Sequence, residues 1–430
     1  MIEKIMKAVK SSNKRRGRNI TIGAVVGFLL SCTAVMGADD NYLWIKNDNG
    51  VIKFSTDNSE PALTDNPYVE NNWLGSTETY INNTVLSGNN NGADGSAYGV
   101  KLGLKSPNFR FINNGAINAS SDSERAYGIY ADDGEVGNIE NNGIINISSN
   151  SSNAYGIRIN NNGKVESIEN NGVITGNSAT GSSAGIGMYD GGSATQIINR
   201  GIINNKISPN GSSTNSNMGI TIDSSSAGAK KIINIGEINS SNDKNAYAYG
   251  IRVRKEAKEV VNAGNIKTFN ANRSFGIASD NLGTSAKISN LLNMGTISSF
   301  DSTTSYGILS NENGKIEKIV NTGVIYGKTY TIRIGSSGTI GDINNYGIFA
   351  TDGDNAISNN GGNMTGTENN YGMYITKKDE QITINVDNDK SNDKPIEVVV
   401  GYNEDGSEIT KSMTIRNAEL NEDKTETESF

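Results

Sequence analysis

The chain has 430 residues, a formal net charge of −8, one cysteine, five prolines and no histidine. The acidic balance argues against nucleic acid and anionic lipid as partners, because both reward clustered Lys and Arg. The lack of histidine excludes Ser-His-Asp and Cys-His catalysis and His-based metal sites, and one cysteine cannot supply a disulfide framework.

Residues 1–38 have the pattern of an extended signal peptide. Their first half holds seven Lys and Arg against one Glu, and residues 20–30 form a short run of apolar and weakly polar residues. Small residues follow before an acidic start, so we expect cleavage between Ala38 and Asp39. The apolar run is too short for a permanent membrane helix, which needs about 20 residues. The sequence therefore predicts the export machinery as a partner.

Cys32 follows the apolar run, in the sequence Leu29-Leu30-Ser31-Cys32. This context resembles a lipobox, in which the cysteine thiol is acylated and becomes the mature N-terminus. The other interpretation is a chance cysteine in a leader that is removed. Lipidation at Cys32 therefore stands as an alternative to cleavage after Ala38.

Residues 39–95 contain both tryptophans, Trp44 and Trp73, and lack the repeated phrases that follow. A stack of strands needs its first edge covered, because an open strand edge pairs with other chains. We therefore expect an N-terminal cap and the first coils of the repeat domain in this segment.

Residues 96–375 form the repeat domain, in which one phrase recurs nine times. It reads apolar residue, any residue, Asn, any residue, Gly, any residue, large apolar residue. Successive glycines are 24 to 35 residues apart. Such variable spacing favours a β-solenoid, because extra residues simply loop out at a corner. The repeated pairs are Asn113 and Gly115, Asn141 and Gly143, Asn170 and Gly172, Asn199 and Gly201, Asn234 and Gly236, Asn262 and Gly264, Asn293 and Gly295, Asn321 and Gly323, and Asn345 and Gly347.

A second phrase, Ala-Tyr-Gly-Ile or a close variant, stands between the copies of the first. One unit then contains three short alternating segments, at residues 155–159, 164–168 and 173–174. Gly and Asn fill the corners between them, where backbone with positive φ is cheap. The pattern predicts an all-β fold: a right-handed parallel β-helix with three strands per coil and repeats of about 28–31 residues.

The repeated asparagine has a structural and a functional interpretation. Its side-chain amide can bond to the counterparts in the coils above and below, or the row of amides can face a ligand. We favour the structural one, because a residue present in every coil is needed by every coil. The recurring tyrosines are interpreted in the same way, as a column inside or flanking the core; they are Tyr98, Tyr127, Tyr155, Tyr249 and Tyr306.

Residues 376–418 change style. Residues 381–386 alternate strictly, and residues 396–402 and 409–415 flank a turn, which predicts an antiparallel hairpin. The oxygen-rich stretch from Asp387 to Asp393 is reminiscent of a calcium loop, but it lacks the closing Gly and Glu spacing, so we expect no metal or other cofactor there. The charged tail at residues 419–430 is expected to be disordered.

The leader, with Arg15-Arg16-Gly17-Arg18 before the apolar run and Met36-Gly37-Ala38-Asp39 after it, resembles the extended signal region of autotransporters, the type V secreted proteins of Gram-negative bacteria. The repeats are similar in style to autotransporter passenger domains. The resemblance implies export to the cell surface, the outer membrane or the medium. The chain departs from the family after Tyr374, where no series of amphipathic membrane strands follows, so we expect it to insert no barrel of its own.

The resemblance implies a structural or adhesive passenger rather than an enzyme, with host or neighbouring-cell surface proteins or glycans as partners. A second hypothesis is a carbohydrate-active β-helix enzyme that uses carboxylates with Lys or Arg. A third is a lipid-anchored surface protein with the same rod. The candidate groups for catalysis are few, and each lies where solvated charge is the default. They are Asp132, Asp133, Asp190, Arg252, Arg254 and Lys255.

Overall fold

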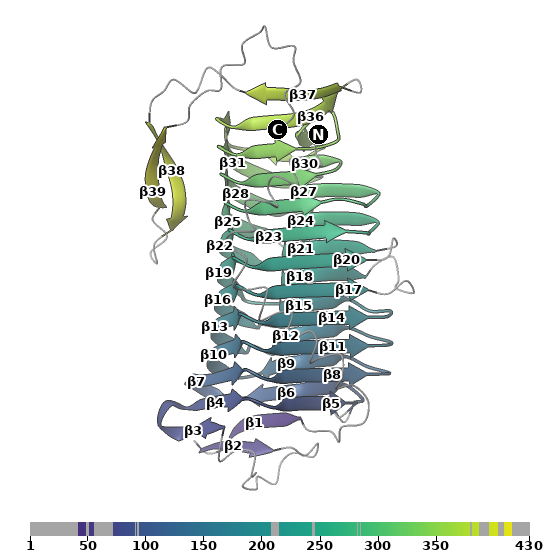
Figure 1. Cartoon of the computed structure of the whole chain (residues 1–430), viewed down its shortest axis with the longest axis vertical. Coiled ribbons are helices and arrows are strands. Elements are labelled where there is room, and N and C mark those ends of the chain that lie inside the picture. Colours follow the sequence, from purple (N-terminus) through teal and green to yellow (C-terminus); the bar gives the residue numbers. More distant parts are fainter. Residues whose placement is uncertain are drawn as a thin grey trace.

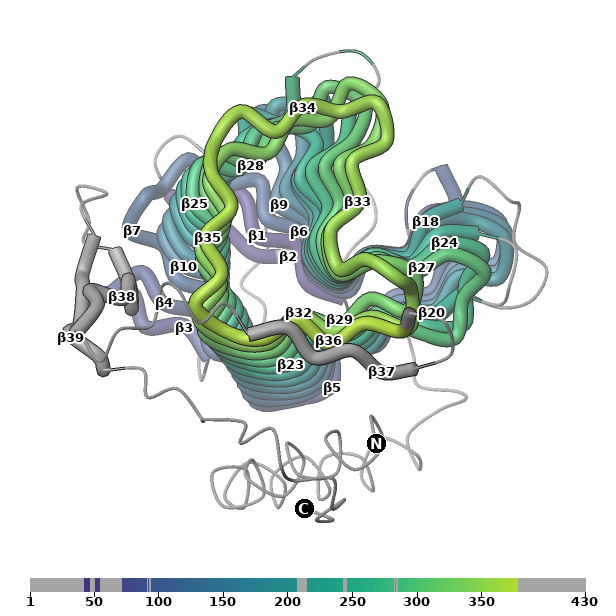
Figure 2. Tube along the Cα trace, turned by 90° about the horizontal axis from the view of Figure 1, so that it is seen from above, coloured from purple at the N-terminus to yellow at the C-terminus, as the bar shows by residue number. Residues whose placement is uncertain are grey.

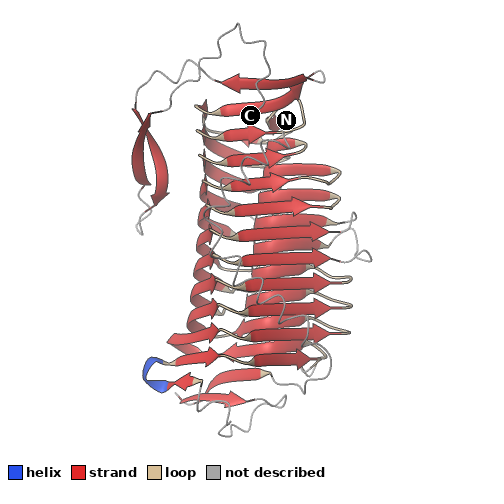
Figure 3. Cartoon of the chain, viewed as in Figure 1, coloured by secondary structure: helices blue, strands red, loops and turns tan. Residues whose placement is uncertain are grey.

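The computed structural model has the expected architecture: an all-β rod of about ten stacked coils (Figure 1). It describes residues 42–48, 51–55, 72–90, 92, 94–207, 215–242, 246–281, 283, 285–378, 381–386, 395–402 and 408–414. Strand dominates throughout, and a short 3-10 helix, η2 (Gly75–Thr77), lies near the N-terminal end of the rod (Figure 3). Stacked coils are about 4.8 Å apart, so ten of them span roughly 48 Å.

Three parallel sheets run the length of the rod, and each coil contributes one strand to each sheet. Seen from the C-terminal end, the last coil runs counter-clockwise from β33 through β34 and β35 to β36 while the stack approaches the viewer, so the winding is right-handed (Figure 2). This is the hand that strand twist favours for parallel crossovers.

Sheet I carries the Ala-Tyr-Gly-Ile phrase. Its strands, in spatial order, are β2 (Val51–Ser55), β1 (Leu43–Asp48), β6 (Ala97–Gly103), β9 (Ala126–Asp132), β12 (Ala154–Asn160), β15 (Ser183–Met188), β18 (Ser216–Ile222), β21 (Tyr247–Val253), β24 (Arg273–Asp280), β27 (Thr304–Asn311), β30 (Tyr330–Ile334) and β33 (Ile357–Asn359).

Most strands of sheet II end on the repeated asparagine, the exceptions being the short β3 and β34. Its strands are β3 (Trp73–Leu74), β4 (Thr79–Asn82), β7 (Lys105–Asn113), β10 (Glu135–Asn141), β13 (Lys164–Asn170), β16 (Ser193–Asn199), β19 (Gly228–Asn234), β22 (Glu256–Asn262), β25 (Ala286–Asn293), β28 (Gly314–Asn321), β31 (Thr339–Asn345) and β34 (Asn363–Met364), with β35 (Glu368–Asn370) also on β31.

Sheet III begins after the repeated glycine. Its strands are β5 (Val85–Asn89), β8 (Ala116–Ser121), β11 (Ile144–Ser149), β14 (Val173–Ser178), β17 (Ile202–Ile207), β20 (Glu237–Asn242), β23 (Asn265–Phe269), β26 (Thr296–Ser299), β29 (Val324–Gly327), β32 (Ile348–Ala350), β36 (Met373–Lys378) and β37 (Gln381–Val386).

Each sheet sends apolar side chains into the interior. In the coil of β12, β13 and β14 they include Ile157, Ile168 and Ile174, all three fully buried, and Ile159 and Val165 add to the same core. The register partners of the first three in the next coil are Ile186, Ile197 and Ile203. The core is therefore a stack of branched aliphatic layers in which every coil covers its neighbours.

Antiparallel strands cover three sheet edges. At the N-terminal end β2 turns back on β1 and β3 pairs with β4, and at the C-terminal end β37 turns back on β36. The expected cap in residues 39–95 thus includes the hairpin of β1 and β2, because an antiparallel strand ends a parallel stack. The expected C-terminal hairpin is present as β38 (Pro395–Tyr402) paired with β39 (Glu408–Thr414).

Candidate functional site

The repeated asparagines form one continuous buried ladder at the corner between sheets II and III. Each Nδ2 donates to the Oδ1 of the asparagine in the next coil over 2.7–2.8 Å, from Asn82 to Asn370. Within the repeat domain each Nδ2 also donates to the carbonyl of the glycine two residues later, over 3.2–3.3 Å. This is the structural role that the sequence favoured. The amides of the ladder are buried, so they are not presented to a ligand.

The glycines of the repeated phrase serve a purpose other than the one we expected. Positive φ explains Gly95, Gly191, Gly228 and Gly361, but not the corner glycines. A Cβ on Gly172 would instead overlap the carbonyl oxygen of Gly143, one coil earlier, and the same holds along the corner. The expectation of left-handed backbone was wrong here, because the limit is the close approach of stacked main chains.

Replacing Asn199 by alanine is expected to lower the free energy of unfolding by roughly 2–4 kcal/mol, because one N–H of the buried Asn170 amide and the Oδ1 of Asn234 lose their ladder partners. Asn171→Ala is the matched control, since Asn171 is exposed and bonds to Asn142 on the outer surface. Chemical denaturation followed by circular dichroism measures both. Equal midpoints for the two variants would contradict the structural role of the ladder.

The recurring tyrosines form a column on the outer face of sheet I, beside the main core rather than within it. The rings of Tyr98, Tyr127 and Tyr155 stack on one another, with centroids 5.0 and 5.6 Å apart and planes within 14° of parallel. Tyr249 continues the column with Phe275 at 4.9 Å. The column therefore flanks the core. The sequence had left open whether the tyrosines lie inside the core or beside it.

Arginine side chains cover this column. The Arg158 guanidinium lies 4.6 Å from the Tyr155 ring and 4.4 Å from the Tyr189 ring. Arg252 lies 4.3 Å from Tyr249. Cation–π contacts of this kind gain strength when the charge is shielded from water. Arginines and tyrosines thus bury one another along the outside of sheet I.

The candidate arginines Arg252 and Arg254 do not carry the solvated charge that their positions predicted. Arg252 Nε and Nη2 donate to the two carboxylate oxygens of Asp280 over 2.9 and 3.0 Å, and both side chains are largely buried. Arg254 pairs with Asp223 at 3.1 Å. The expectation of free surface charge was therefore wrong for both arginines, and only Lys255 of the three lacks an ion pair among the described residues. Removing either partner of the buried Arg252–Asp280 pair would leave an uncompensated charge.

The acidic candidates do not gather with these arginines. Asp132 ends β9, and Asp190 follows β15, two coils further along the stack. Asp133 and Asp190 adopt positive φ at tight turns, and the Asp190 carboxylate faces Arg158 at 3.4 Å. Among the described residues no three acidic or thiol side chains come together as metal ligands. These positions therefore do not form a shared catalytic centre.

Raising the pH above about 10 is expected to destabilise the rod. Burial raises the pKa of Tyr127, Tyr189 and Tyr249 above the usual value near 10. A folded-state pKa above the unfolded one gives stability that is complete below pH 10 and is lost as the pH rises beyond it. The melting temperature should stay level from pH 7 to 9 and fall above about pH 10, and the Tyr127→Phe and Tyr249→Phe double variant should show a smaller fall. A level profile up to pH 11.5 would contradict this.

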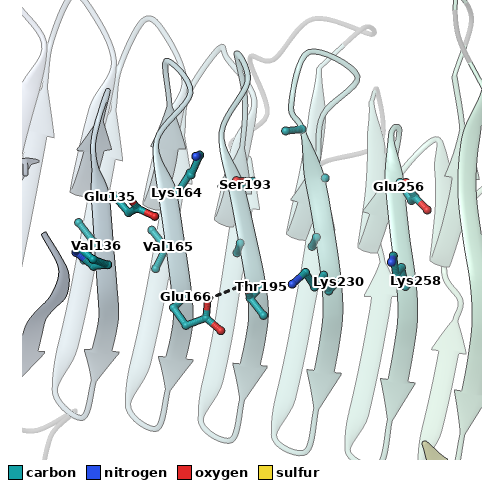
Figure 4. A pocket seen from close by; sticks show the side chains of 15 residues that line it. Glu135, Val136, Lys164, Val165, Glu166, Ser193, Thr195, Lys230, Glu256 and Lys258 are labelled. Atoms are coloured by element: carbon teal, nitrogen blue, oxygen red, sulfur yellow. Dashed lines mark hydrogen bonds between the residues drawn. The ribbon is translucent and has the colours of Figure 1, made fainter. Parts of the chain in front are cut away.

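A shallow hollow of about 550 Å³ crosses the outer face of sheet II (Figure 4). It runs over β10, β13, β16, β19 and β22, and buried Val and Ala side chains form its floor. Two columns of side chains line it, with Lys and Glu mixed in both. One holds Glu135, Lys164, Ser193 and Glu256, and the other holds Glu166, Thr195, Lys230 and Lys258.

In this hollow the Thr195 hydroxyl donates to Glu166 Oε2 over 2.9 Å (Figure 4). Lys164, Glu166 and Lys230 are all exposed. Sequence reasoning missed these residues, although aligning the units on the corner glycine would have placed them in columns. Mixed exposed charges give a surface that can take a polar partner.

The remaining predicted sites lie outside the described residues. They are the cleavage pair Ala38 and Asp39, the lipobox cysteine Cys32, and the oxygen-rich stretch 387–393. Among the residues that the structure does describe, no helix has the length and hydrophobicity to cross a bilayer. No family model, curated protein or solved structure matches the chain.

Proposed function

We propose that this protein is an exported rod that acts at the cell surface as a structural or adhesive element, without catalysis. The single observation that supports this most is where the repeated residues lie. The asparagine ladder and the apolar columns are all directed into the stack, so the features that recur build the rod. The varied side chains of the outer faces are left for contacts with partners.

The leader supports export. Residues 1–38 combine a basic region, a short apolar run and small residues before an acidic start. The same segment carries the resemblance to autotransporters, so the rod would serve as a passenger and its partners would be proteins or glycans of a host or neighbouring cell. An acidic, disulfide-free rod needs no cofactor, and its stability comes from stacking.

Export is tested in a Gram-negative host that expresses the full chain and, as a control, a chain without residues 2–38. Surface biotinylation, cell fractionation and mass spectrometry of the mature N-terminus should find the full chain outside the inner membrane, beginning at Asp39. The leaderless chain should stay in the cytoplasm. An acylated Cys32 at the N-terminus would replace the soluble passenger with a lipoprotein, and cytoplasmic retention of both chains would overturn the proposal.

The alternative, a carbohydrate-active enzyme, has its support in the sheet II hollow, where Lys164 and Glu166 stand two residues apart on β13. Incubation of the purified chain with pectin, mucin glycans and matrix proteins separates the two functions. We expect saturable binding without turnover. Turnover that disappears in Glu166→Gln would favour the enzyme instead.

A further inference from the structure

A column of side chains on the outer face of sheet III is interrupted by one small residue. In register along the stack, this column reads Lys206, Ser241, Phe269 and Phe300. The two phenylalanine rings stack with centroids 5.5 Å apart and planes 9° from parallel. One face of Phe269 is thus covered by Phe300, and the other face is directed toward the coil of Ser241. The serine side chain is too short to cover it.

The four side chains of this column line a hollow of about 420 Å³, together with polar side chains of the adjacent columns. Lys206 and Phe269 stand two coils apart, which is roughly 9.6 Å. A ring placed over Ser241 would therefore lie about 4.8 Å from Phe269, within the range of roughly 4.5–7 Å at which rings stack. The space over Ser241 therefore has the height of one stacked ring.

The groups around the hollow are those that bind a hydroxylated, acidic ring. Asn239 Nδ2 donates to Asn204 Oδ1 over 2.7 Å, so the remaining N–H and lone pair of this amide pair are available to hydroxyl groups. Lys267 pairs with Glu237 at 2.6 Å, and Lys206 is exposed at the far wall. Two lysines against one glutamate make the lining cationic, on a chain whose net charge is −8.

We propose that this hollow binds one carboxylated sugar ring, of the uronic or sialic acid type, at the end or within a glycan. The ring stacks on the free face of Phe269, its hydroxyls meet Asn204 and Asn239, and its carboxylate pairs with Lys206. An aromatic side chain of a protein partner would fill the same space, but it would make no hydrogen bond to Asn204 or Asn239 and no ion pair with Lys206. The inference deepens the adhesive role proposed above and rests on it for its biological setting.

The decisive variant fills the gap. Ser241→Phe should continue the stack of Phe269 and Phe300, keep or raise the melting temperature, and occupy the space of the sugar. Ser148→Phe is the matched control, because Ser148 lies two coils before Lys206 in the same column and outside the hollow. Isothermal titration with trigalacturonate and with 3′-sialyllactose should show binding to the full chain and to Ser148→Phe. Ser241→Phe should bind at least about tenfold more weakly.

A second variant tests the charge. Lys206→Ala should weaken binding of the two acidic sugars about tenfold and leave a neutral trisaccharide such as maltotriose unchanged, because a charged hydrogen bond is lost. Lys230→Ala, in the sheet II hollow, is the control. Which acidic sugar binds more tightly identifies its source as a uronate polymer or a sialylated glycan.

Equal affinity of Ser241→Phe and the unchanged chain, no binding of either acidic sugar, or binding only of aromatic peptides would each overturn the proposal. These results leave surface display untouched, since that is read from biotinylation of cells. Conversely, a chain that binds acidic sugars but stays in the cytoplasm would support the sugar site and contradict the proposed function at the cell surface. The two failures are therefore distinguishable.

Discussion

Replacing Ile174 by aspartate is expected to lower the free energy of unfolding by several kcal/mol, enough to unfold the middle of the rod. Ile174 is fully buried and stands between Ile145 and Ile203 in the sheet III column. Its Cγ2 also fills the space beside Gly156 of sheet I, so the aspartate would disrupt two sheets at once. A carboxylate placed there has no cation within the core to pair with among the described residues.

The matched control is Lys164→Ala in the same coil. Lys164 is exposed on β13 and belongs to no ion pair among those that the described residues form. Its loss should change the melting temperature by no more than ordinary surface substitutions do, within about 0.5 kcal/mol. Differential scanning calorimetry of both variants measures the effect, and similar shifts for the two would show that the facing of these strands is misassigned.

Replacing Gly172 by alanine is expected to cost at least about 3 kcal/mol although it adds a single methyl group. The new Cβ would overlap the carbonyl oxygen of Gly143, which accepts the backbone N–H of Val173 and cannot turn away without breaking the coil contact. A clash with main-chain atoms, unlike a clash with a side chain, is not relieved by a change of rotamer.

Gly283→Ala is the control for this prediction, because a Cβ on Gly283 would have no atom within 4 Å. Thermal unfolding should separate the variants by many degrees, with Gly283→Ala close to the unchanged chain. A Gly172→Ala chain that melts normally would mean that neighbouring coils can separate at this corner, and the continuous ladder would then have to bend there.

The fold could be predicted from the sequence because the rod repeats one local rule. The apolar pair around each Asn–Gly phrase, such as Ile168 and Ile174, already defines two buried columns, and the Ala-Tyr-Gly-Ile phrase defines the third. In a solenoid each coil contacts only its neighbours, so period and alternation are sufficient to fix the facing of the strands.

The features that could not be predicted depend on which residues the register brings together. Arg252 and Asp280 are 28 residues apart, and only the pairing of β21 with β24 places them side by side. The clash that makes Gly172 necessary involves a carbonyl of the preceding coil. The gap beside Phe269 arises because Ser241, in the preceding coil, is small. Each of these three features depends on two neighbouring coils, whereas a sequence motif describes the residues of a single coil.

The asparagine ladder gives the rod an electrical direction. Every side-chain amide donates toward the next coil, so the amide dipoles point the same way from Asn82 onward. The bond from each Nδ2 to the glycine carbonyl fixes this orientation, because an inverted amide would set two oxygens against each other. Aligned amides add as they do in a helix, with the positive end toward the C-terminal coils, and such chains polarise one another.

This polarity makes the two ends chemically different. At the N-terminal end the ladder begins with an acceptor, and the Thr84 backbone N–H and hydroxyl donate to Asn82 Oδ1 over 3.2 and 3.1 Å. Each finished coil then presents an oriented donor to the coil that follows it in the chain. Folding that starts at the N-terminal end, where Asn82 Oδ1 already has its donors, can extend one coil at a time toward the C-terminus. The Oδ1 of each new asparagine then accepts from an Nδ2 that the preceding coil has already oriented.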